Sequence, residues 1–342
     1  MAQKTKVLVL GANGFIGNAL VRKLLEDESL ELFGLDLDAS RLEDVIEHPG
    51  FHFREGDIYL SNEWIEYHVK KCDVVVSLVA VATPRVYVEN PLKVFQLDFE
   101  ANLKIVKWVA KYGKRIVFPS SSEVYGMCPD ETFNEYSSPL VLGPVHESRW
   151  IYSCCKQLLD RVLVALGARG DLRYTLVRPF NWIGPQLDTL ELAREGNARV
   201  ITVFISNLLR DDPLVLVGGG AQKRTFTYLS DGIEGLAGII RTNDGVLDGK
   251  VFNLGNPANH ISIQEAAEIL VEEYDKLFPG KFTAGTEVQS PEEFYGPGYE
   301  DMVARVPDIS EAENLLGWHP KVGVRDAIRL TLEAFLRDEE LI

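Results

Sequence analysis

A strand-like run, a glycine-rich turn and a helix-like run follow one another near the start of the sequence. Residues 6–10 (KVLVL) form a run that is apolar after Lys6, and residues 11–17 (GANGFIG), which carry three glycines, follow it. Residues 15–25 then show the spacing of a helix. A short apolar run without alternation is typical of a strand buried on both faces, as in a parallel sheet. The segment therefore predicts the first half of a βαβ unit.

The same alternation continues to about residue 180. Further strands are expected at residues 32–35, 74–79, 116–118 and 175–177, and helices at residues 63–69, 94–111 and 151–166. Strand–helix alternation predicts an α/β fold, a Rossmann-type doubly wound parallel sheet. After Pro179 the pattern changes, with helices expected at residues 198–209, 263–274 and 324–336 and strands at residues 214–217 and 252–254. We expect a cofactor domain at residues 1–180 with a return segment at 226–256, and a smaller C-terminal substrate-binding lobe at 181–225 and 257–342.

Composition and charge narrow the choice of partners. The formal net charge is −16, so nucleic acid and membrane surfaces are poor partners, although local Arg and Lys residues can still attract a small anion. The four cysteines match no zinc pattern, and the six histidines are scattered, so no metal site is expected. Reduced thiols and the lack of a signal-peptide pattern or membrane-length apolar run favour a cytoplasmic location.

The glycine turn predicts a dinucleotide site. Glycines let the backbone approach a pyrophosphate, whose charge lies at the N-terminus of the following helix. Asp36 ends the second strand, where a carboxylate accepts hydrogen bonds from a ribose 2′-hydroxyl and repels a 2′-phosphate, which favours NAD over NADP. The alternative is a surface aspartate, and Asp38 is a rival candidate. Asp57 and Ile58 are expected near the adenine, although aspartate commonly caps helices. The expected turn residues are Gly11, Asn13, Gly14, Phe15, Ile16 and Gly17.

Two further motifs predict the chemistry. Tyr152 and Lys156 are four residues apart on an expected helix, so they share one face. The ammonium is expected to lower the pKa of the phenol, which then takes a proton from a sugar hydroxyl as hydride leaves for NAD. Residues 120–126 (SSSEVYG) follow the strand at 116–118, which places Ser121, Ser122 and Glu123 at the carboxyl edge of the sheet. The alternative is a serine-rich turn.

These motifs, together with residues 178–181 (RPFN), resemble the extended short-chain dehydrogenases of the NAD-dependent epimerase/dehydratase family, which modify nucleotide sugars. Longer segments are similar to the UDP-glucuronic acid oxidative decarboxylase domain of the bifunctional enzyme that makes UDP-4-amino-4-deoxy-L-arabinose in polymyxin resistance, a lipopolysaccharide modification. The resemblance covers nearly the whole chain. The segments are WIEYHVKKCDVV (64–75), FPSSSEVYGM (118–127), RWIYSCCKQLLDRV (149–162), RPFNWIGP (178–185) and YGPGYEDM (295–302).

The resemblance implies roles for individual residues. Ser121 would bond the sugar 4-hydroxyl, Ser122 and Glu123 would handle the carboxylate-bearing carbon, and Arg305 would act near the substrate carboxylate. From the residues alone, Arg305 could equally be a surface arginine paired with Asp301 or Asp308. Val215 stands where the relative carries Lys, a departure at one nucleotide contact. The expected UDP-sugar positions are Tyr87, Asn181, Arg199, Gln222, Arg224 and Tyr299. Further expected cofactor positions are Leu78, Ala80, Asn102, Tyr152, Lys156 and Arg178.

The expected reaction is the NAD-dependent oxidative decarboxylation of UDP-glucuronic acid to UDP-4-keto-pentose, CO₂ and NADH. Oxidation at carbon 4 makes the carboxylate a β-keto acid, and loss of CO₂ then leaves an enolate that Tyr152 can stabilise. The Ser122-Glu123 pair differs from the Asp-Glu pair of resembling 4,6-dehydratases, and resembling 4-epimerases lack the carboxylate. Two alternatives remain: a UDP-xylose synthase that reduces the ketone again, and a non-catalytic regulator that binds NAD or UDP-sugar.

The resemblance also implies a homodimer formed by the helices at 94–111 and 151–166, whose alternative role is simple burial against the sheet.

Overall fold

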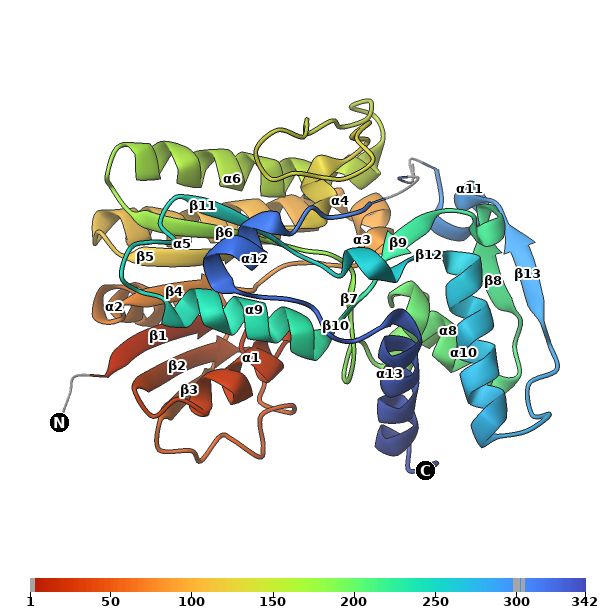
Figure 1. The fold of residues 1–342 in the computed structure, drawn as a ribbon. Coiled ribbons are helices and arrows are strands. Elements are labelled where there is room, and N and C mark those ends of the chain that lie inside the picture. The colour runs from red at the N-terminus through yellow and green to blue at the C-terminus, as the bar shows by residue number, and fades with distance from the viewer. Residues whose placement is uncertain (1–3, 298–301, 303–304) are drawn as a thin grey trace.

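The centre of the fold is a seven-stranded sheet, in which every pair of neighbouring strands is parallel (Figure 1). The structure is a computed structural model, which describes residues 4–297, 302 and 305–342. The strand order is β11-β6-β5-β4-β1-β2-β3. The chain therefore runs outward from β1 in one direction, and from β4 in the other, which confirms the expected doubly wound α/β sheet. These strands are β1 (Thr5–Leu10), β2 (Leu30–Asp36), β3 (Phe51–Glu55), β4 (Val74–Ser77), β5 (Arg115–Pro119), β6 (Arg173–Pro179) and β11 (Lys250–Leu254).

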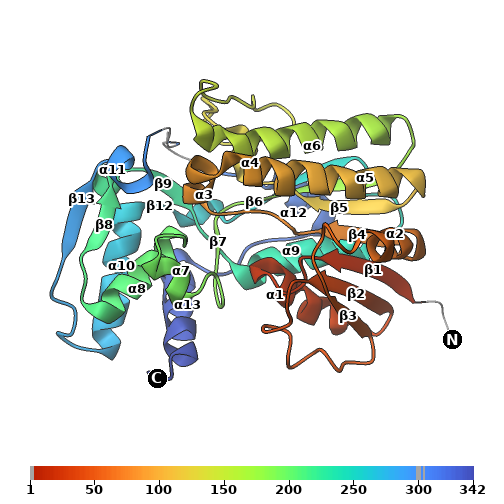
Figure 2. The same cartoon turned by 180° about the vertical axis from the view of Figure 1, so that it is seen from behind.

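Both faces of the central strands of the sheet are buried, as the unalternating apolar runs predict. In β1, Val7 and Val9 pack into one hydrophobic cluster and Leu8 and Leu10 into another, because successive side chains of a strand point to opposite faces. On one face lie α1 (Phe15–Leu25) and α9 (Leu229–Arg241), which contact each other. The other face carries α2 (Asn62–Lys71), α5 (Asn102–Lys111) and α6 (Ile151–Ala168) (Figure 2).

Leu158 and Val164 lie exposed on α6. The pairing of α5 and α6 between subunits stays a prediction. Within the part of the chain that the structure describes, no helix combines the length and apolarity that crossing a bilayer requires.

The C-terminal elements gather beside the carboxyl ends of the sheet strands (Figures 1 and 2). This region contains α8 (Val200–Arg210), α10 (Ile263–Leu277) and α13 (Val324–Asp338), which contact one another. Three two-stranded sheets join it, formed by β7 (Trp182–Ile183) with β10 (Thr227–Tyr228), β9 (Lys223–Thr225) with β12 (His260–Ser262), and β8 (Leu214–Val217) with β13 (Thr286–Gln289). The remaining helices are α3 (Pro84–Glu89), α4 (Pro91–Val94), α7 (Leu190–Arg194), α11 (Pro291–Tyr295) and α12 (Ser310–Leu316), with 3₁₀ turns η2 (Ser122–Tyr125), η3 (Ser148–Trp150), η4 (Gly218–Gly220) and η5 (Pro257–Asn259).

One expected helix differs in its geometry. Residues 94–111 are divided between the end of α4, a π-helical turn η1 (Phe95–Ala101) and α5. A π-helical turn inside a helix is rare and is frequently found at a functional site. The turn brings the buried side chain of Asp98 to face α6, which packs directly against η1.

Candidate active site

The glycine turn lies where the strand order reverses, between β1 and β4. Gly11 has φ +82°, and a Cβ atom there would lie 3.1 Å from the carbonyl carbon of Leu78, just after β4. A Cβ atom on Gly17 would lie 2.0 Å from the Gly11 carbonyl oxygen. Helix α1 begins directly after Gly14, which supplies no side-chain cap for the first N–H groups. The turn thus leaves a backbone cradle open at a helix N-terminus, which fits the pyrophosphate of a dinucleotide.

Asp36 closes this cradle from the end of β2. Its Oδ2 accepts the backbone N–H of Asn13 at 2.7 Å, and its Oδ1 accepts the N–H of Leu37 at 2.7 Å. The Asn13 side chain donates to Asp38 at 2.7 Å. Each carboxylate oxygen has two lone pairs, so Asp36 retains acceptor capacity for a ribose hydroxyl. The residues present therefore fit NAD, and Asp38 supports the turn through Asn13.

A cleft of about 460 Å³ extends from the glycine turn across the carboxyl ends of the strands. We call it the main cleft. It brings together most of the residues expected from the sequence. Those that line it are Gly11, Gly14, Phe15, Ile16, Gly17, Leu78, Ala80, Tyr87, Ser121, Ser122, Glu123, Tyr152, Lys156, Asn181, Arg199 and Arg305.

Tyr152 and Lys156 lie on one face of α6 and are almost completely buried. The Lys156 Nζ lies 5.7 Å from the centre of the Tyr152 ring. The ring of Tyr87 stacks on that of Tyr152, with centroids 4.7 Å apart and planes 4° from parallel. The Ser121 hydroxyl hydrogen-bonds the phenol and also caps η2 by accepting the Glu123 N–H at 3.1 Å. The expected Ser–Tyr–Lys grouping is therefore present at one wall of the cleft.

The expected lowering of the Tyr152 pKa is wrong for this state of the protein. Burial raises the pKa of the phenol, the charge of Asp98 raises it further, and the hydrogen bond from Ser121 opposes the rise. The Lys156 ammonium lies 3.9 Å from the Asp98 carboxylate, whose negative charge opposes the effect of the ammonium on the phenol. The sequence spacing identified the pair but gave no sign of this third group.

Glu123 lies between two buried arginines. Its Oε2 lies 2.6 Å from Arg149 Nη1 and its Oε1 lies 2.5 Å from Arg305 Nη1. The Glu123 side chain is 16% exposed, and those of Arg149 and Arg305 are 2% and 4% exposed. Burial alone would raise the carboxyl pKa, but Arg149 and Arg305 outweigh it and lower the pKa to about 2. We call these three residues the carboxylate clamp. Its geometry rejects the alternative in which Arg305 is a surface arginine.

Arg305 reaches the clamp because its segment is tied to two distant parts of the chain. The Thr225 hydroxyl donates to the Arg305 carbonyl at 2.5 Å, and the Phe133 N–H donates to the Val306 carbonyl at 2.7 Å. The Asp308 N–H donates back to the Phe133 carbonyl at 2.9 Å. The arginine is therefore positioned by β9 on one side and by the loop after β5 on the other.

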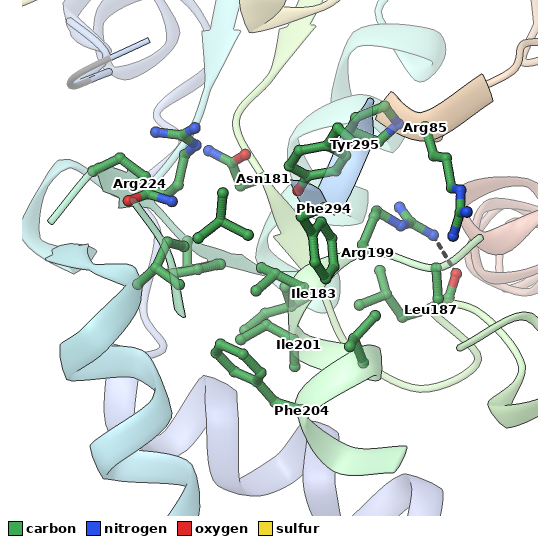
Figure 3. Close-up of a pocket in the computed structure, with 18 of the residues that line it drawn as sticks. Arg85, Asn181, Ile183, Leu187, Arg199, Ile201, Phe204, Arg224, Phe294 and Tyr295 are labelled. Atoms are coloured by element: carbon green, nitrogen blue, oxygen red, sulfur yellow. Dashed lines mark hydrogen bonds between the residues drawn. The ribbon is translucent and has the colours of Figure 1, made fainter. Parts of the chain in front are cut away.

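A second hollow of about 150 Å³ continues from the main cleft into the C-terminal elements. We call it the inner pocket. Figure 3 shows Ile183, Ile201 and Phe204 grouped on one side of it, and Arg224 and Asn181 on another. Arg199 bonds the carboxylate of Asp188 at 2.9 Å and the Leu187 carbonyl. The expected UDP positions Asn181, Arg199, Gln222 and Arg224 all line this pocket, together with Val215.

Several expected residues lie away from both hollows. Asp57 caps a turn by accepting the Tyr59 N–H at 2.6 Å, and Ile58 lines a separate surface hollow. Asn102 is 1% exposed and bonds Ser77 and backbone carbonyls. Arg178 is 4% exposed and contacts the hydroxyl of Tyr125 and the carboxylate of Asp160. The structure therefore gives Asn102 and Arg178 supporting contacts beneath the site. Tyr299 lies outside the described residues.

Three residues at the site were missed by the sequence reasoning. Arg149 precedes Tyr152 by three positions, so a search for cations near the catalytic helix could have found it. Arg41 lines the main cleft beside the glycine turn, five residues after Asp36. Asp98 carried no sequence signal, because its position depends on the π-helical turn.

Comparison with known proteins agrees with the fold. The structure of the PbgP3 protein from Burkholderia pseudomallei is 46% identical, covers 97% of this chain and 96% of its own, and has a TM-score of 0.88. The UDP-glucuronic acid 4-epimerase from Bacillus cereus, in complex with UDP-glucuronic acid and NAD, is 21% identical over 97% of this chain and 99% of its own, with a TM-score of 0.78. The dTDP-glucose 4,6-dehydratase from Bacillus anthracis, in complex with NAD, is 20% identical over 98% of each chain, with a TM-score of 0.78. The last two show a shared fold.

A family match identifies the chain more directly. Residues 7–255 match the family described as NAD dependent epimerase/dehydratase. This range contains the glycine turn, Asp36, the clamp residues Glu123 and Arg149, and the Tyr152–Lys156 pair. The match confirms the expected membership of the extended short-chain dehydrogenases and the expected cofactor, NAD. The chain is an enzyme of the NAD-dependent epimerase/dehydratase family.

Proposed function

We propose that this enzyme oxidises and decarboxylates UDP-glucuronic acid, and releases UDP-4-keto-pentose and CO₂. The observation that carries the proposal is the carboxylate clamp, Arg149–Glu123–Arg305, beside Ser121 and Tyr152. Two guanidinium groups surround one carboxylate, and the charge of Arg224 also acts on Glu123. The local charge is therefore positive in a chain of net charge −16. Such a site favours a sugar that carries its own carboxylate.

The first step is oxidation at carbon 4 of the sugar. NAD, when bound at the glycine turn, supplies the hydride acceptor. Tyr152 acts as general base in its ionised form, which burial makes the minor form in the resting protein, and takes the proton of the 4-hydroxyl. Ser121 orients that hydroxyl through its own hydroxyl group. The stacked ring of Tyr87 keeps the phenol fixed in the wall of the cleft. The product of this step is a ketone at carbon 4.

The second step breaks the bond between carbon 5 and the carboxylate carbon. The electron pair of that bond moves into the ketone as an enolate, and CO₂ leaves. The phenol of Tyr152, now protonated, and the Ser121 hydroxyl stabilise the enolate oxygen. Carbon 5 then takes a proton from solvent, and Tyr152 returns to solvent the proton that it took from the 4-hydroxyl. Glu123 stays ionised at neutral pH because its pKa is about 2. In this proposal it holds Arg149 and Arg305 in place and does not act as an acid.

The inner pocket suits the nucleotide part of the substrate. It joins the main cleft at Asn181, Arg199 and Arg305, and combines an apolar wall with Arg224 and Gln222. A flat base can lie against the apolar wall while the cations attract the diphosphate. Val215 contributes an apolar side chain to this pocket. The division of the chain into a cofactor domain and a substrate lobe is part of the same proposal.

The test is an assay of the purified chain with UDP-glucuronic acid and NAD. Equal amounts of NADH and CO₂, with a keto-pentose product by mass, are expected. CO₂ without net NADH and a UDP-pentose product would indicate the UDP-xylose synthase alternative. A product of unchanged mass would indicate epimerisation. No conversion by a protein that binds NAD would reject the proposal and leave the regulator alternative. Tyr152→Phe should lower turnover about 10²- to 10⁴-fold while NAD still binds.

A further inference from the structure

Lys156 is a buried cation whose charge needs a partner. Its side chain is 3% exposed, and burial lowers the pKa of the ammonium. The carboxylates of Asp98 and Asp160 oppose that effect, with Asp98 the stronger of the two. Asp160 is itself close to Arg178, at 3.4 Å. Asp98 is therefore the principal counter-ion of Lys156.

Asp98 is held in place for this role. Its side chain is fully buried, in the π-helical turn η1. Its Oδ2 accepts the N–H of Val81 at 2.9 Å, in the loop that follows β4. Its Oδ1 has no hydrogen-bond partner among the described residues and lies 3.9 Å from Lys156 Nζ. A buried carboxylate oxygen without a hydrogen bond is costly, so its position facing Lys156 requires a reason.

We propose that Asp98 is a positioning residue of the active site, which keeps the Lys156 ammonium protonated beside the phenol of Tyr152 through a charge pair between η1 and α6. Asp98 lines neither the main cleft nor the inner pocket. The inference rests on the proposed function, because it assigns Asp98 to the oxidation in which Tyr152 accepts a proton. It explains why a π-helical turn occurs here, since the turn directs the carboxylate at α6.

The other groups around Asp98 do not provide an alternative partner. The charge of Asp98 acts on four neighbouring groups, which are Tyr152 and Cys155 of α6, Tyr87 of α3 and Tyr59 of the loop before α2. The pKa of each group is raised, mainly by burial, and the charge of Asp98 raises it further. All four are therefore neutral near pH 7. The lysines of α4 and α5, which also pack on η1, are exposed; they are Lys93, Lys104, Lys107 and Lys111.

The expected effect of removing the charge has a definite sign. Burial raises the pKa of Asp98 to about 6 although Lys156 lowers it, so the carboxylate is mostly ionised at pH 7. In Asp98→Asn the buried ammonium loses its counter-ion, and the pKa of Lys156 should fall. Tyr152 is neutral in the resting protein, and the ionised form that the oxidation uses needs a positive Lys156 beside it. The basic limb of the pH–rate profile should therefore move to lower pH, by about 1 to 3 pH units.

The experiment measures kcat/KM for UDP-glucuronic acid against pH in Asp98→Asn and in the unsubstituted enzyme. Glu100→Gln is the matched control, because it removes an exposed carboxylate from the same π-helical turn. This variant should leave the pH dependence of kcat/KM unchanged. In a Lys156→Arg background, Asp98→Asn should no longer move the basic limb, since a guanidinium stays protonated. A uniform loss of rate with an unmoved limb, or the same shift in the Lys156→Arg background, would overturn the proposal.

A second measurement needs neither turnover nor a variant of Asp98. The protein is labelled with ¹⁵N at lysine side chains, and the Nζ signal of Lys156 is assigned by its loss in Lys156→Arg. The proposal expects this signal to respond as Asp98 takes up a proton near pH 6. A signal that does not change between about pH 5 and 7 would overturn the proposal. A coupled signal in a protein that does not convert UDP-glucuronic acid would reject the proposed function and retain the charge pair.

Discussion

Replacing Glu123 by Gln removes the anion between Arg149 and Arg305 with little change in shape. In the folded protein the two arginines lower the carboxyl pKa of Glu123 from 4.5 to about 2. Because one pKa unit is worth about 1.4 kcal/mol, the ionised carboxylate stabilises the fold by about 3 kcal/mol. Leaving the buried cations Arg149 and Arg305 without their anionic partner lowers the free energy of unfolding by a similar amount. Glu123→Gln should therefore destabilise the protein by about 3 kcal/mol at neutral pH.

The assay is thermal unfolding followed by circular dichroism at several pH values. A chain of 342 residues has an unfolding entropy of about 0.7 kcal/mol per kelvin, so the Tm should fall by about 4 to 5 °C. The pKa of Glu123 is lower in the folded than in the unfolded protein, so its ionised carboxylate contributes fully to the free energy of unfolding above about pH 4.5. This contribution is lost as the pH falls toward about 2. The Tm difference should therefore be constant between about pH 6 and 8.

The control for this experiment is Glu131→Gln, because Glu131 is exposed and its replacement should leave the Tm unchanged. A Glu123→Gln protein whose Tm matches that of the parent at pH 7 would refute the reasoning. So would a Tm difference that changes strongly between about pH 6 and 8, because Glu123 would then be titrating in that range.

Three further predictions concern ligand binding. Gly17→Ala should abolish NAD binding or folding, because the new methyl group would lie 2.0 Å from the Gly11 carbonyl oxygen; normal NAD titration of a soluble variant would contradict this. Asp36→Asn should weaken NAD binding about tenfold and leave NADP binding unchanged or stronger, measured by calorimetry; an unchanged preference for NAD would exclude a ribose contact. Arg305→Met should raise the Kd for UDP-glucuronic acid about 10- to 100-fold and leave that for UDP-glucose unchanged, whereas an equal loss for both sugars would exclude recognition of the carboxylate.

The sheet was predictable because its strands are buried on both faces. Residues Val7 to Leu10 and Val74 to Val76 are all apolar and buried, and this pattern is typical of strands inside a parallel sheet. Helix α9, in contrast, was not predicted from the sequence. It contains Gly232, Gly235 and Gly238, and glycine is a poor helix former.

Two of the glycines of α9 are explained by packing. A Cβ atom at Gly232 would lie 2.4 Å from the Trp182 ring, and one at Gly235 would lie 3.0 Å from Leu254. The helix is therefore stabilised by close approach to β7 and β11, which no local pattern records. Helix propensity did not indicate a helix at residues 229–241, because tertiary contacts stabilise it.

The site was predictable where one local spacing carried the chemistry. Tyr152 and Lys156 lie four apart on one helix face, and the glycine turn needs only its own strand and helix. Arg149 and Asp98 act through contacts with residues far along the chain, so their roles appear only after folding. The pKa of Tyr152 depends on burial and on Asp98. Its direction therefore could not be read from the spacing to Lys156.

The backbone tie that positions Arg305 has a consequence for how the binding properties arise. The cofactor cradle is complete once the first strands have paired, whereas the clamp waits for a segment that follows Glu123 by more than half of the chain. Changes at residues 305–308 and at their anchors Phe133 and Thr225 would therefore alter the recognition of the sugar carboxylate without changing the contacts of the glycine turn.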